Sequence, residues 1–201
     1  MWSIIQAAGW PIWPLIFASV IALALIFERL WSLRQSVVAP EGLVDKVLAE
    51  YRVTGVTPEL LTKTAQQGPL GRILSVGLAN VRSPRPVMKE SIEEVGRIVT
   101  HDLDRFLTTL GTIAAMAPLL GLFGTVVGMI EIFGSQTAAG SNPIQLAHGI
   151  SVALYNTAFG LIVAIPSMIF YRHFRATVDS LVVEMEQQAI KLVDFAHGER
   201  Q

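Results

Sequence analysis

Three apolar segments, at residues 10–27, 107–130 and 144–171, dominate the hydropathy pattern of the chain. A helix of ~20 predominantly apolar residues crosses a bilayer core, and each segment comes close to that length or exceeds it. Outside these segments, apolar residues recur at intervals of three and four among charged ones, which is typical of amphipathic helices. The pattern therefore predicts an all-α membrane protein with three transmembrane helices.

The second and third spans are expected to extend into the cytoplasm as long helices. From Val87 onward the sequence has no strong helix breaker until Gly111, inside span two, and Met88, Ile92 and Leu103 belong to one apolar stripe. Residues 172–196 have the same spacing. We therefore expect one long helix that leads into span two and another that continues from span three, able to pack as an antiparallel pair.

The segment between spans one and two is predicted to form short helices. Residues 41–51 have helical spacing, Thr57 is a candidate N-cap before Pro58, and another helix follows Pro69. The prolines within residues 83–86 then break the chain. These boundaries divide the chain into an N-terminal span (1–34), a helical segment leading into span two (35–105), two further spans (106–171) and a helical tail (172–201).

Basic residues predict the orientation of the spans. All 15 Lys and Arg lie between residues 29 and 105 or after residue 171, so none lies before span one or between spans two and three. The positive-inside rule then predicts an N-terminus outside the cytoplasm, with residues 35–105 and the C-terminal tail inside it. A cleaved signal peptide is disfavoured because no basic residue precedes the first apolar segment, so we expect a retained membrane span.

Composition excludes several classes of function. Hydrophobic residues make up 52% of the chain and charged residues 15%, against about 25% charged in soluble domains. The net charge of −1 gives no basis for nucleic-acid binding, and the absence of cysteine excludes disulfides and thiolate metal sites. The four histidines are scattered, and no HExxH or GxSxG motif is present. We therefore predict neither an enzyme nor a bound cofactor.

Spans two and three carry small and polar residues at helical spacing. Small residues let helices approach closely in lipid, and the candidates for helix packing are Pro118, Gly121, Gly124, Gly128, Gly149, Gly160 and Pro166. The candidates for lining a channel are Thr125, Ser151, Tyr155, Asn156 and Thr157. A polar group at mid-membrane needs a partner or water, so these residues indicate a shared polar seam, although threonine can also bond back to its own helix.

Two ionisable residues flank the link between spans two and three. Glu131 and His148 lie near the outer ends of these spans. One interpretation is an interfacial pair that faces water. The other is a vestibule where protons enter, because histidine and glutamate side chains can exchange protons with water there. No acidic residue lies in the middle of either span, although a proton path through a bilayer usually needs a titratable carrier.

Two sequence blocks carry a family resemblance. The blocks GLFGTVVGM (residues 121–129) and GISVALYNTAFGLIVAIP (149–166) resemble the proton-channel family of MotA, TolQ and ExbB. The three-span layout with its long loop after span one is more similar to ExbB and TolQ than to four-span MotA. In motif, the resemblance covers roughly residues 95–175.

The resemblance implies a pentamer of this subunit around a dimer of a single-span, ExbD- or TolR-like partner. Such a complex lies in the bacterial inner membrane, which would make the N-terminus periplasmic and the C-terminus cytoplasmic, and it uses the proton gradient to drive a TonB- or TolA-like protein. It also implies that Thr125 and Thr157 line the central cavity. The family often has a glutamate where this chain has Val152, which cannot titrate. Either the partner's membrane aspartate carries the proton alone, with Thr125, Thr157 and Ser151 holding water, or the complex conducts differently.

Besides an ExbB-like subunit that energises a TonB-type protein for transport across the outer membrane, two other interpretations of the function stay open. A TolQ-like subunit for envelope maintenance has the same layout of spans. A homo-oligomeric scaffold without conduction would use the small-residue faces for assembly, and the missing mid-membrane carboxylate favours it modestly.

Overall fold

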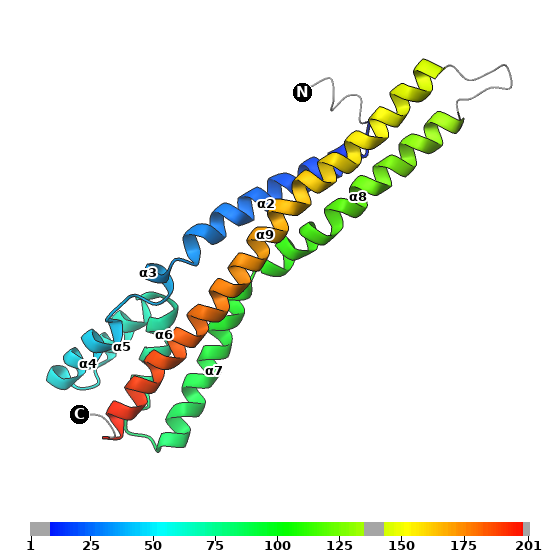
Figure 1. Cartoon of the computed structure of the whole chain (residues 1–201). Helices are drawn as coiled ribbons and strands as arrows, with labels where there is room; N and C mark the ends of the chain where they lie inside the picture. Colours follow the sequence, from blue (N-terminus) through cyan, green and yellow to red (C-terminus); the bar gives the residue numbers. More distant parts are fainter. Residues whose placement is uncertain (1–8, 135–142, 199–201) are drawn as a thin grey trace. The chain divides into compact units, whose positions relative to one another are not determined.

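The protein folds entirely into helices over the residues that the structure describes. The computed structural model describes residues 9–134 and 143–198, without the side chains of Pro143, Gln145, His148 and Val152. The helices are α2 (Ile12–Ser32), α3 (Gln35–Val38), α4 (Leu43–Thr54), α5 (Pro58–Ala65), α6 (Gly68–Ala79), α7 (Arg85–Asp104), α8 (Leu107–Gly134) and α9 (Pro143–Ala196) (Figure 1). Three stretches are long and apolar enough to cross a membrane, which confirms the predicted fold class: Ile12–Ser32, Arg85–Gly134 and Gly149–Ala196.

Local sequence signals account for several helix ends. Gly55 ends α4 with φ of 68°, a conformation that glycine adopts without a steric penalty. Thr57 then caps α5, because its hydroxyl accepts a hydrogen bond from the Leu60 N–H at 3.2 Å, and Pro58 follows at the first helical position. This is the N-cap that the sequence predicts. Helix α7 begins at Arg85, within the predicted break.

The long helix predicted to run into span two is interrupted. Helix α7 ends at Asp104 and α8 begins at Leu107. Arg105 between them is extended, with φ of −52° and ψ of 139°, and Phe106 has a positive φ of 69°. Neither residue is glycine or proline, so the sequence gives no local signal for this break. By contrast, α9 is a continuous helix of 54 residues from span three into the tail, as predicted.

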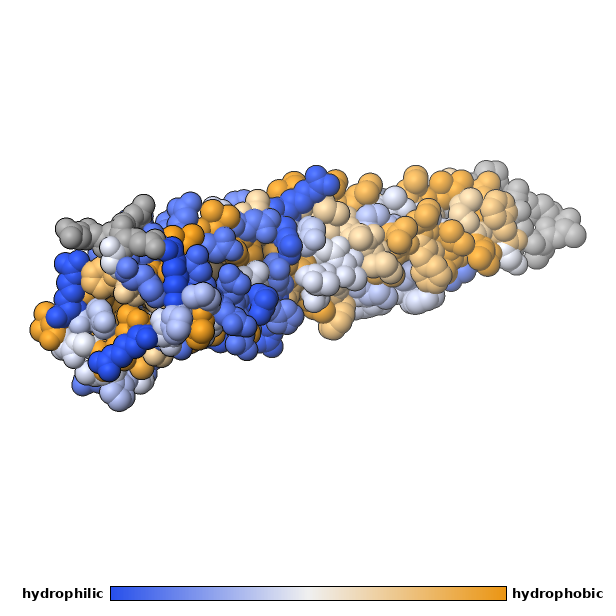
Figure 2. Space-filling model, turned by 90° about the horizontal axis from the view of Figure 1, so that it is seen from below, coloured by the Kyte–Doolittle hydropathy of each residue, from blue (hydrophilic) through white to orange (hydrophobic). Residues whose placement is uncertain are grey.

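The chain divides into two compact units. The first, here called the apolar unit, comprises Met1–Glu28 and Phe106–His173; the second, called the polar unit, comprises Arg29–Arg105 and Phe174–Gln201. On the face shown in Figure 2, hydrophobic residues cover the apolar unit, whereas hydrophilic residues are interspersed with hydrophobic ones over the polar unit. The distribution is that expected of one unit in lipid and one in water.

In the apolar unit, α2 and the first part of α9 lie beside α8 (Figure 1). Leu15, Ala117 and Ala164, one from each helix, form a buried cluster. The ring of Trp10, just before α2, meets the Phe123 ring of α8 edge-on, with centroids 6.1 Å apart. Large apolar side chains nevertheless remain exposed on the unit, such as Phe17 and Ile162. Exposed apolar surface of this extent is suited to contact with lipid or other membrane helices.

In the polar unit, α7 and the tail of α9 run antiparallel, as predicted. Arg85 at the start of α7 pairs with Asp194 near the end of α9 at 3.1 Å, and Asp104 at the end of α7 pairs with Arg175 at 2.9 Å. Helix α6 completes the core, because a Cβ on its Gly77 would meet the Leu192 side chain of α9 at 2.6 Å. Short helices α3, α4 and α5 complete the unit, and Gln35 of α3 donates to Glu184 of α9 at 3.1 Å.

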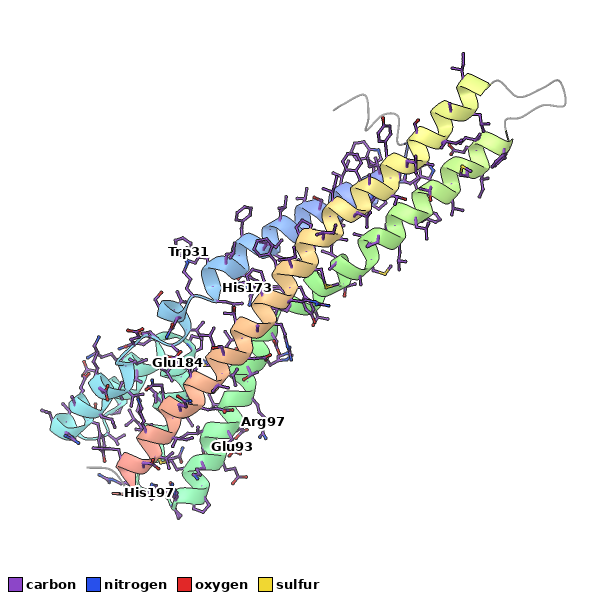
Figure 3. The ribbon with its side chains drawn as sticks, viewed as in Figure 1. Trp31, Glu93, Arg97, His173, Glu184 and His197 are labelled. Carbon is purple, nitrogen blue, oxygen red and sulfur yellow. The ribbon has the colours of Figure 1, made fainter. Side chains whose placement is uncertain are left out.

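A groove runs between α7 and α9 within the polar unit. Ile92, Met185 and Ala189 contribute apolar side chains to it. Figure 3 shows Glu93 and Arg97 projecting from α7, where they also line this groove.

Candidate functional site at the contact between α8 and α9

Glycines bring the backbones of α8 and α9 into direct contact. A Cβ built on Gly121 would lie 2.8 Å from the Asn156 carbonyl oxygen and 3.1 Å from the Thr157 Cα. A Cβ on Gly160 would lie 2.7 Å from the Ala117 carbonyl oxygen. The two distances to carbonyl oxygens, 2.8 and 2.7 Å, are too short for a real Cβ, so only glycine fits at either position without a shift of the backbone. This close approach is the geometry that small residues permit between membrane helices.

The contact extends along both helices. Towards one end, a Cβ on Gly111 would meet the Tyr171 ring at 3.0 Å. Towards the other, Gly128 faces Ala153 at 3.5 Å, and Gly149 faces the Ile132 side chain. Among the packing candidates, Pro118 is half-buried within α8 and Pro166 is exposed within α9. Gly124 also faces α9. The structure therefore brings five of the candidate glycines into the contact: Gly121, Gly124, Gly128, Gly149 and Gly160.

Two of the predicted polar residues lie in this contact. Asn156 is 1% exposed, and a Cβ on Gly124 would lie 2.7 Å from its Cβ and Cγ. The Thr157 hydroxyl donates to the Gly121 carbonyl oxygen at 3.4 Å, a bond between the two helices. A buried amide and an interhelical hydroxyl bond lie one residue apart on α9, so this part of the contact is polar.

Thr125 lies on a different part of the α8 surface. Its hydroxyl donates to the Leu122 carbonyl oxygen of its own helix at 2.6 Å. It borders a shallow hollow whose other lining residues are apolar or glycine: Val126, Met129, Ile130, Phe133 and Gly134. Thr125 thus faces a surface that a neighbouring helix or lipid can cover, whereas Thr157 faces α8.

The remaining predicted channel residues are exposed. Ser151 donates to the Ala147 carbonyl oxygen at 2.9 Å, and Tyr155 is 39% exposed. Glu131 is exposed near the end of α8. The side chains of His148 and Val152 lie outside the described residues, so the predicted pairing of Glu131 with His148 stays a prediction. Within one chain, the structure therefore groups only Asn156 and Thr157 with the glycines of α8.

Ser167 and Arg29 are also buried, although neither is among the candidates for lining a channel. Ser167 is 2% exposed and donates to the Val163 carbonyl oxygen at 2.7 Å. Arg29 is 6% exposed and donates to the Leu103 carbonyl oxygen at 3.0 Å. The only sequence signal for Arg29 is that it is the first basic residue after an apolar segment. Over the part of the chain that the structure describes, no three His, Asp or Glu residues come together as a metal site would require.

The sequence of the chain is similar to proteins of one membrane-protein family. The profile of the MotA/TolQ/ExbB proton channel family matches residues 65–187, which include the α8–α9 contact. A putative biopolymer transport protein, ExbB-like 3, from Synechocystis is 34% identical over 85% of this chain and 83% of its own length. Biopolymer transport protein exbB1 from Vibrio cholerae is 32% identical over 81% of this chain and 74% of its own length.

A relative from the Tol-Pal system is also similar over most of its length. The Tol-Pal system protein TolQ from Pseudomonas aeruginosa is 28% identical over 90% of this chain and 86% of its own length. The matched profile covers more than half of the chain, and its matched residues contain the glycine contact and the polar pair of α9. The chain therefore belongs to the MotA/TolQ/ExbB proton channel family.

Proposed function

We propose that this chain is an ExbB-like subunit of a proton-driven motor or channel in the bacterial inner membrane. With an ExbD-like partner, it would energise a TonB-type protein for transport across the outer membrane. Two relatives at 32–34% identity are named as biopolymer transport proteins, whereas the TolQ relative is 28% identical, so the names favour the ExbB-like role. The observation that carries the proposal is the polar α8–α9 contact formed by Thr157 and Asn156.

In this proposal, the glycines of the contact hold the two helices together and the threonine hydroxyls order water. Gly121 and Gly160 hold the helices close enough for the Thr157 hydroxyl to reach the Gly121 carbonyl. Thr125 would present a second hydroxyl to the space enclosed by a ring of subunits, where it could order water. Hydroxyls hold water chains but do not ionise near neutral pH.

A titratable group must then come from another protein. The sequence of residues 107–130 and 149–171 contains no Asp, Glu, Lys or Arg. Val152, at the position where the family often has glutamate, cannot supply one. We therefore propose that a carboxylate in the membrane span of the ExbD-like partner carries the proton past Thr125 and Thr157. Ser151 and Tyr155, which are exposed, would contact that partner or a second copy of this chain.

The proposed orientation follows from the distribution of charge. All basic residues lie between 29 and 105 or after 171, so the N-terminus would be periplasmic and the polar unit cytoplasmic. Glu131 and His148 would then lie at the periplasmic side, where protons enter. We further propose a homo-oligomer, a pentamer by resemblance to the family, in which the exposed apolar surfaces of α8 and α9 contact neighbouring copies.

A TolQ-like role in envelope maintenance is the second candidate. The similarity to the TolQ relative over 90% of this chain supports it. Both roles use the same proton-driven machinery and differ in the periplasmic protein that is driven. Co-purification with a TonB-like rather than a TolA-like protein would distinguish them.

Proton flux through the reconstituted complex tests the proposal. The chain is incorporated into liposomes with its ExbD-like partner, and acidification of the lumen is followed after a proton gradient is imposed. We expect flux in wild type and a several-fold lower flux in Thr125→Val and Thr157→Val, because valine keeps the side-chain shape and removes the hydroxyl.

Thr112→Val is the matched control. Thr112 lies on the same helix as Thr125, is exposed, and donates to the Thr108 carbonyl of its own helix at 2.8 Å. The control is expected to conduct like wild type. Absence of flux in the wild-type complex would favour the non-conducting scaffold, and equal loss in all three variants would show that the hydroxyls have no specific role.

A further inference from the structure

The end of α2 carries an exposed tryptophan with an arginine stacked on its ring. Trp31 is 68% exposed, and Figure 3 shows it projecting from the end of α2. The Cζ atom of Arg34 lies 4.4 Å from the centroid of the Trp31 ring, which is a cation–π contact. Arg34 is itself exposed, in an extended conformation between α2 and α3. Stacking holds the face of the guanidinium and leaves the N–H groups at its edge able to donate.

Over the residues that the structure describes, no carboxylate pairs with Arg34. By contrast, Arg72, Arg85 and Arg175 each pair with an aspartate at 2.9–3.1 Å. The carboxylate of Glu184 accepts hydrogen bonds from the neighbouring Gln35 through both oxygens at 3.1 Å, so it is already engaged. The turn between α2 and α3 therefore presents a positive charge that this part of the chain does not neutralise.

The length of α2 sets the depth of this pair in a bilayer. At 1.5 Å per residue, its 21 residues span about 31 Å, which matches a hydrocarbon core of ~30 Å. Trp10 and Trp13, each 58% exposed, lie at the opposite end of α2. Tryptophan is enriched at both boundaries between hydrocarbon and water. With Trp31 at one boundary, Arg34 comes three residues further along the chain, at the level of the lipid phosphates.

A phospholipid fits both the charge and the apolar surface of this pair. A guanidinium can donate two parallel hydrogen bonds to a phosphate, and the planar group is already oriented by Trp31. Leu30 is 41% exposed beside Trp31 and offers an apolar surface to an acyl chain, which a free phosphate ion would leave uncovered. A zwitterionic headgroup brings its own cation, which competes with Arg34. The chemistry therefore favours a lipid with a net negative headgroup.

We propose that Trp31 and Arg34 form a binding site for the headgroup of an anionic phospholipid of the phosphatidylglycerol type. Arg34 binds the phosphate, Trp31 holds the guanidinium in place, and Leu30 and Trp31 contact the upper part of an acyl chain. The site requires only that α2 spans a bilayer. It does not depend on which ion the complex conducts or which protein it drives.

Lipid retention by the full chain tests the proposal. The chain is extracted with a maltoside detergent from bilayers of equal parts phosphatidylglycerol and phosphatidylcholine, and the lipids that remain bound after washing are quantified by mass spectrometry. Wild type should retain phosphatidylglycerol in excess. Arg34→Gln should lower the ratio of the two lipids by up to about fivefold, the factor that one basic residue contributes at an anionic surface. Arg34→Lys, which keeps the charge without the planar fork, should lie between them. Trp31→Leu, which removes the stacking, should also lower the ratio.

Arg52→Gln is the matched control. Arg52 of α4 is also exposed, and its Cζ lies over the Phe195 ring at 4.8 Å, so the variant removes the same charge from the same kind of contact. It should retain lipid like wild type. An equal loss in Arg34→Gln and Arg52→Gln, or no loss in Arg34→Gln, would overturn the proposal.

Two further results would also contradict the lipid site. One is a wild-type chain that retains both lipids equally. The other is displacement of the retained phosphatidylglycerol by glycerophosphoglycerol, the same headgroup without acyl chains, because the site would then bind a soluble phosphate. We expect the soluble headgroup to displace none. Helix content measured by circular dichroism should match wild type in every variant, since all the altered side chains are exposed.

Discussion

Replacing Gly121 with alanine is expected to force α8 and α9 apart. The added methyl group would lie 2.8 Å from the Asn156 carbonyl oxygen and 3.1 Å from the Thr157 Cα. Both obstructing atoms belong to the backbone, so no rotation of a side chain relieves the contact. The helices must therefore separate locally, which also lengthens the hydrogen bond from Thr157 to the Gly121 carbonyl, already 3.4 Å.

Two opposing effects set the change in stability that Gly121→Ala causes. Overpacking of a close contact typically costs about 1–3 kcal/mol, and the rigid backbone obstacles favour the upper end. Alanine in a helix interior gains about 1 kcal/mol over glycine. The net loss of stability is thus about 1–2 kcal/mol. At about 2–4 °C per kcal/mol for a chain of this size, the thermal midpoint should fall by about 2–8 °C.

Thermal unfolding of purified variants in one lipid mixture measures this effect, and the proton-flux assay measures its functional consequence. Gly96→Ala is the matched control, because Gly96 lies within α7 and a Cβ there would have no atom within 4 Å. It should raise stability by up to about 1 kcal/mol through helix propensity alone. If Gly121→Ala were as stable as Gly96→Ala, the close backbone contact between α8 and α9 would be refuted.

Two further substitutions test the polar unit. Phe174 is 2% exposed, so Phe174→Ala should lower the free energy of unfolding by about 3–5 kcal/mol. Val183 is 52% exposed on the same helix, so Val183→Ala should change it by less than about 1 kcal/mol. Similar losses for the two variants in chemical denaturation would contradict the described core. Thr57→Ala should lower the free energy of unfolding by about 1 kcal/mol because it removes the cap of α5. The exposed hydroxyl of Thr62 donates to the Pro58 carbonyl, and Thr62→Ala should leave the stability nearly unchanged. Equal denaturation midpoints for the two variants would argue against the cap.

The helical segments were predictable from sequence because their signals are local. An apolar run long enough to span a bilayer is a property of composition, and each of the three runs corresponds to a helix that can cross a membrane. The cap at Thr57 follows from neighbouring residues alone. The pairing of α7 with the tail of α9 followed from matched apolar stripes, since two amphipathic helices bury those stripes against each other.

The polar seam was only partly predictable. Helical spacing indicates which residues of one helix share a face, but it does not tell which face meets a neighbour. Gly121 and Gly124 allow α9 to approach, and this contact selects Asn156 and Thr157. Thr125 immediately follows Gly124 but lies about 100° further around the helix, so its hydroxyl bonds to α8 itself.

By itself, the sequence determined the three membrane-capable helices, the helical tail and the blocks that mark the family, because each depends on residues near one another in the chain. Only the tertiary structure decided where the helix leading into span two is broken. Arg105 and Phe106 carry no breaker signal, and the group that caps the end of α7 is Arg29, brought there by folding. A continuous helix is the locally favoured choice, and neither its interruption nor the position of the buried Arg29 follows from a local pattern in the sequence.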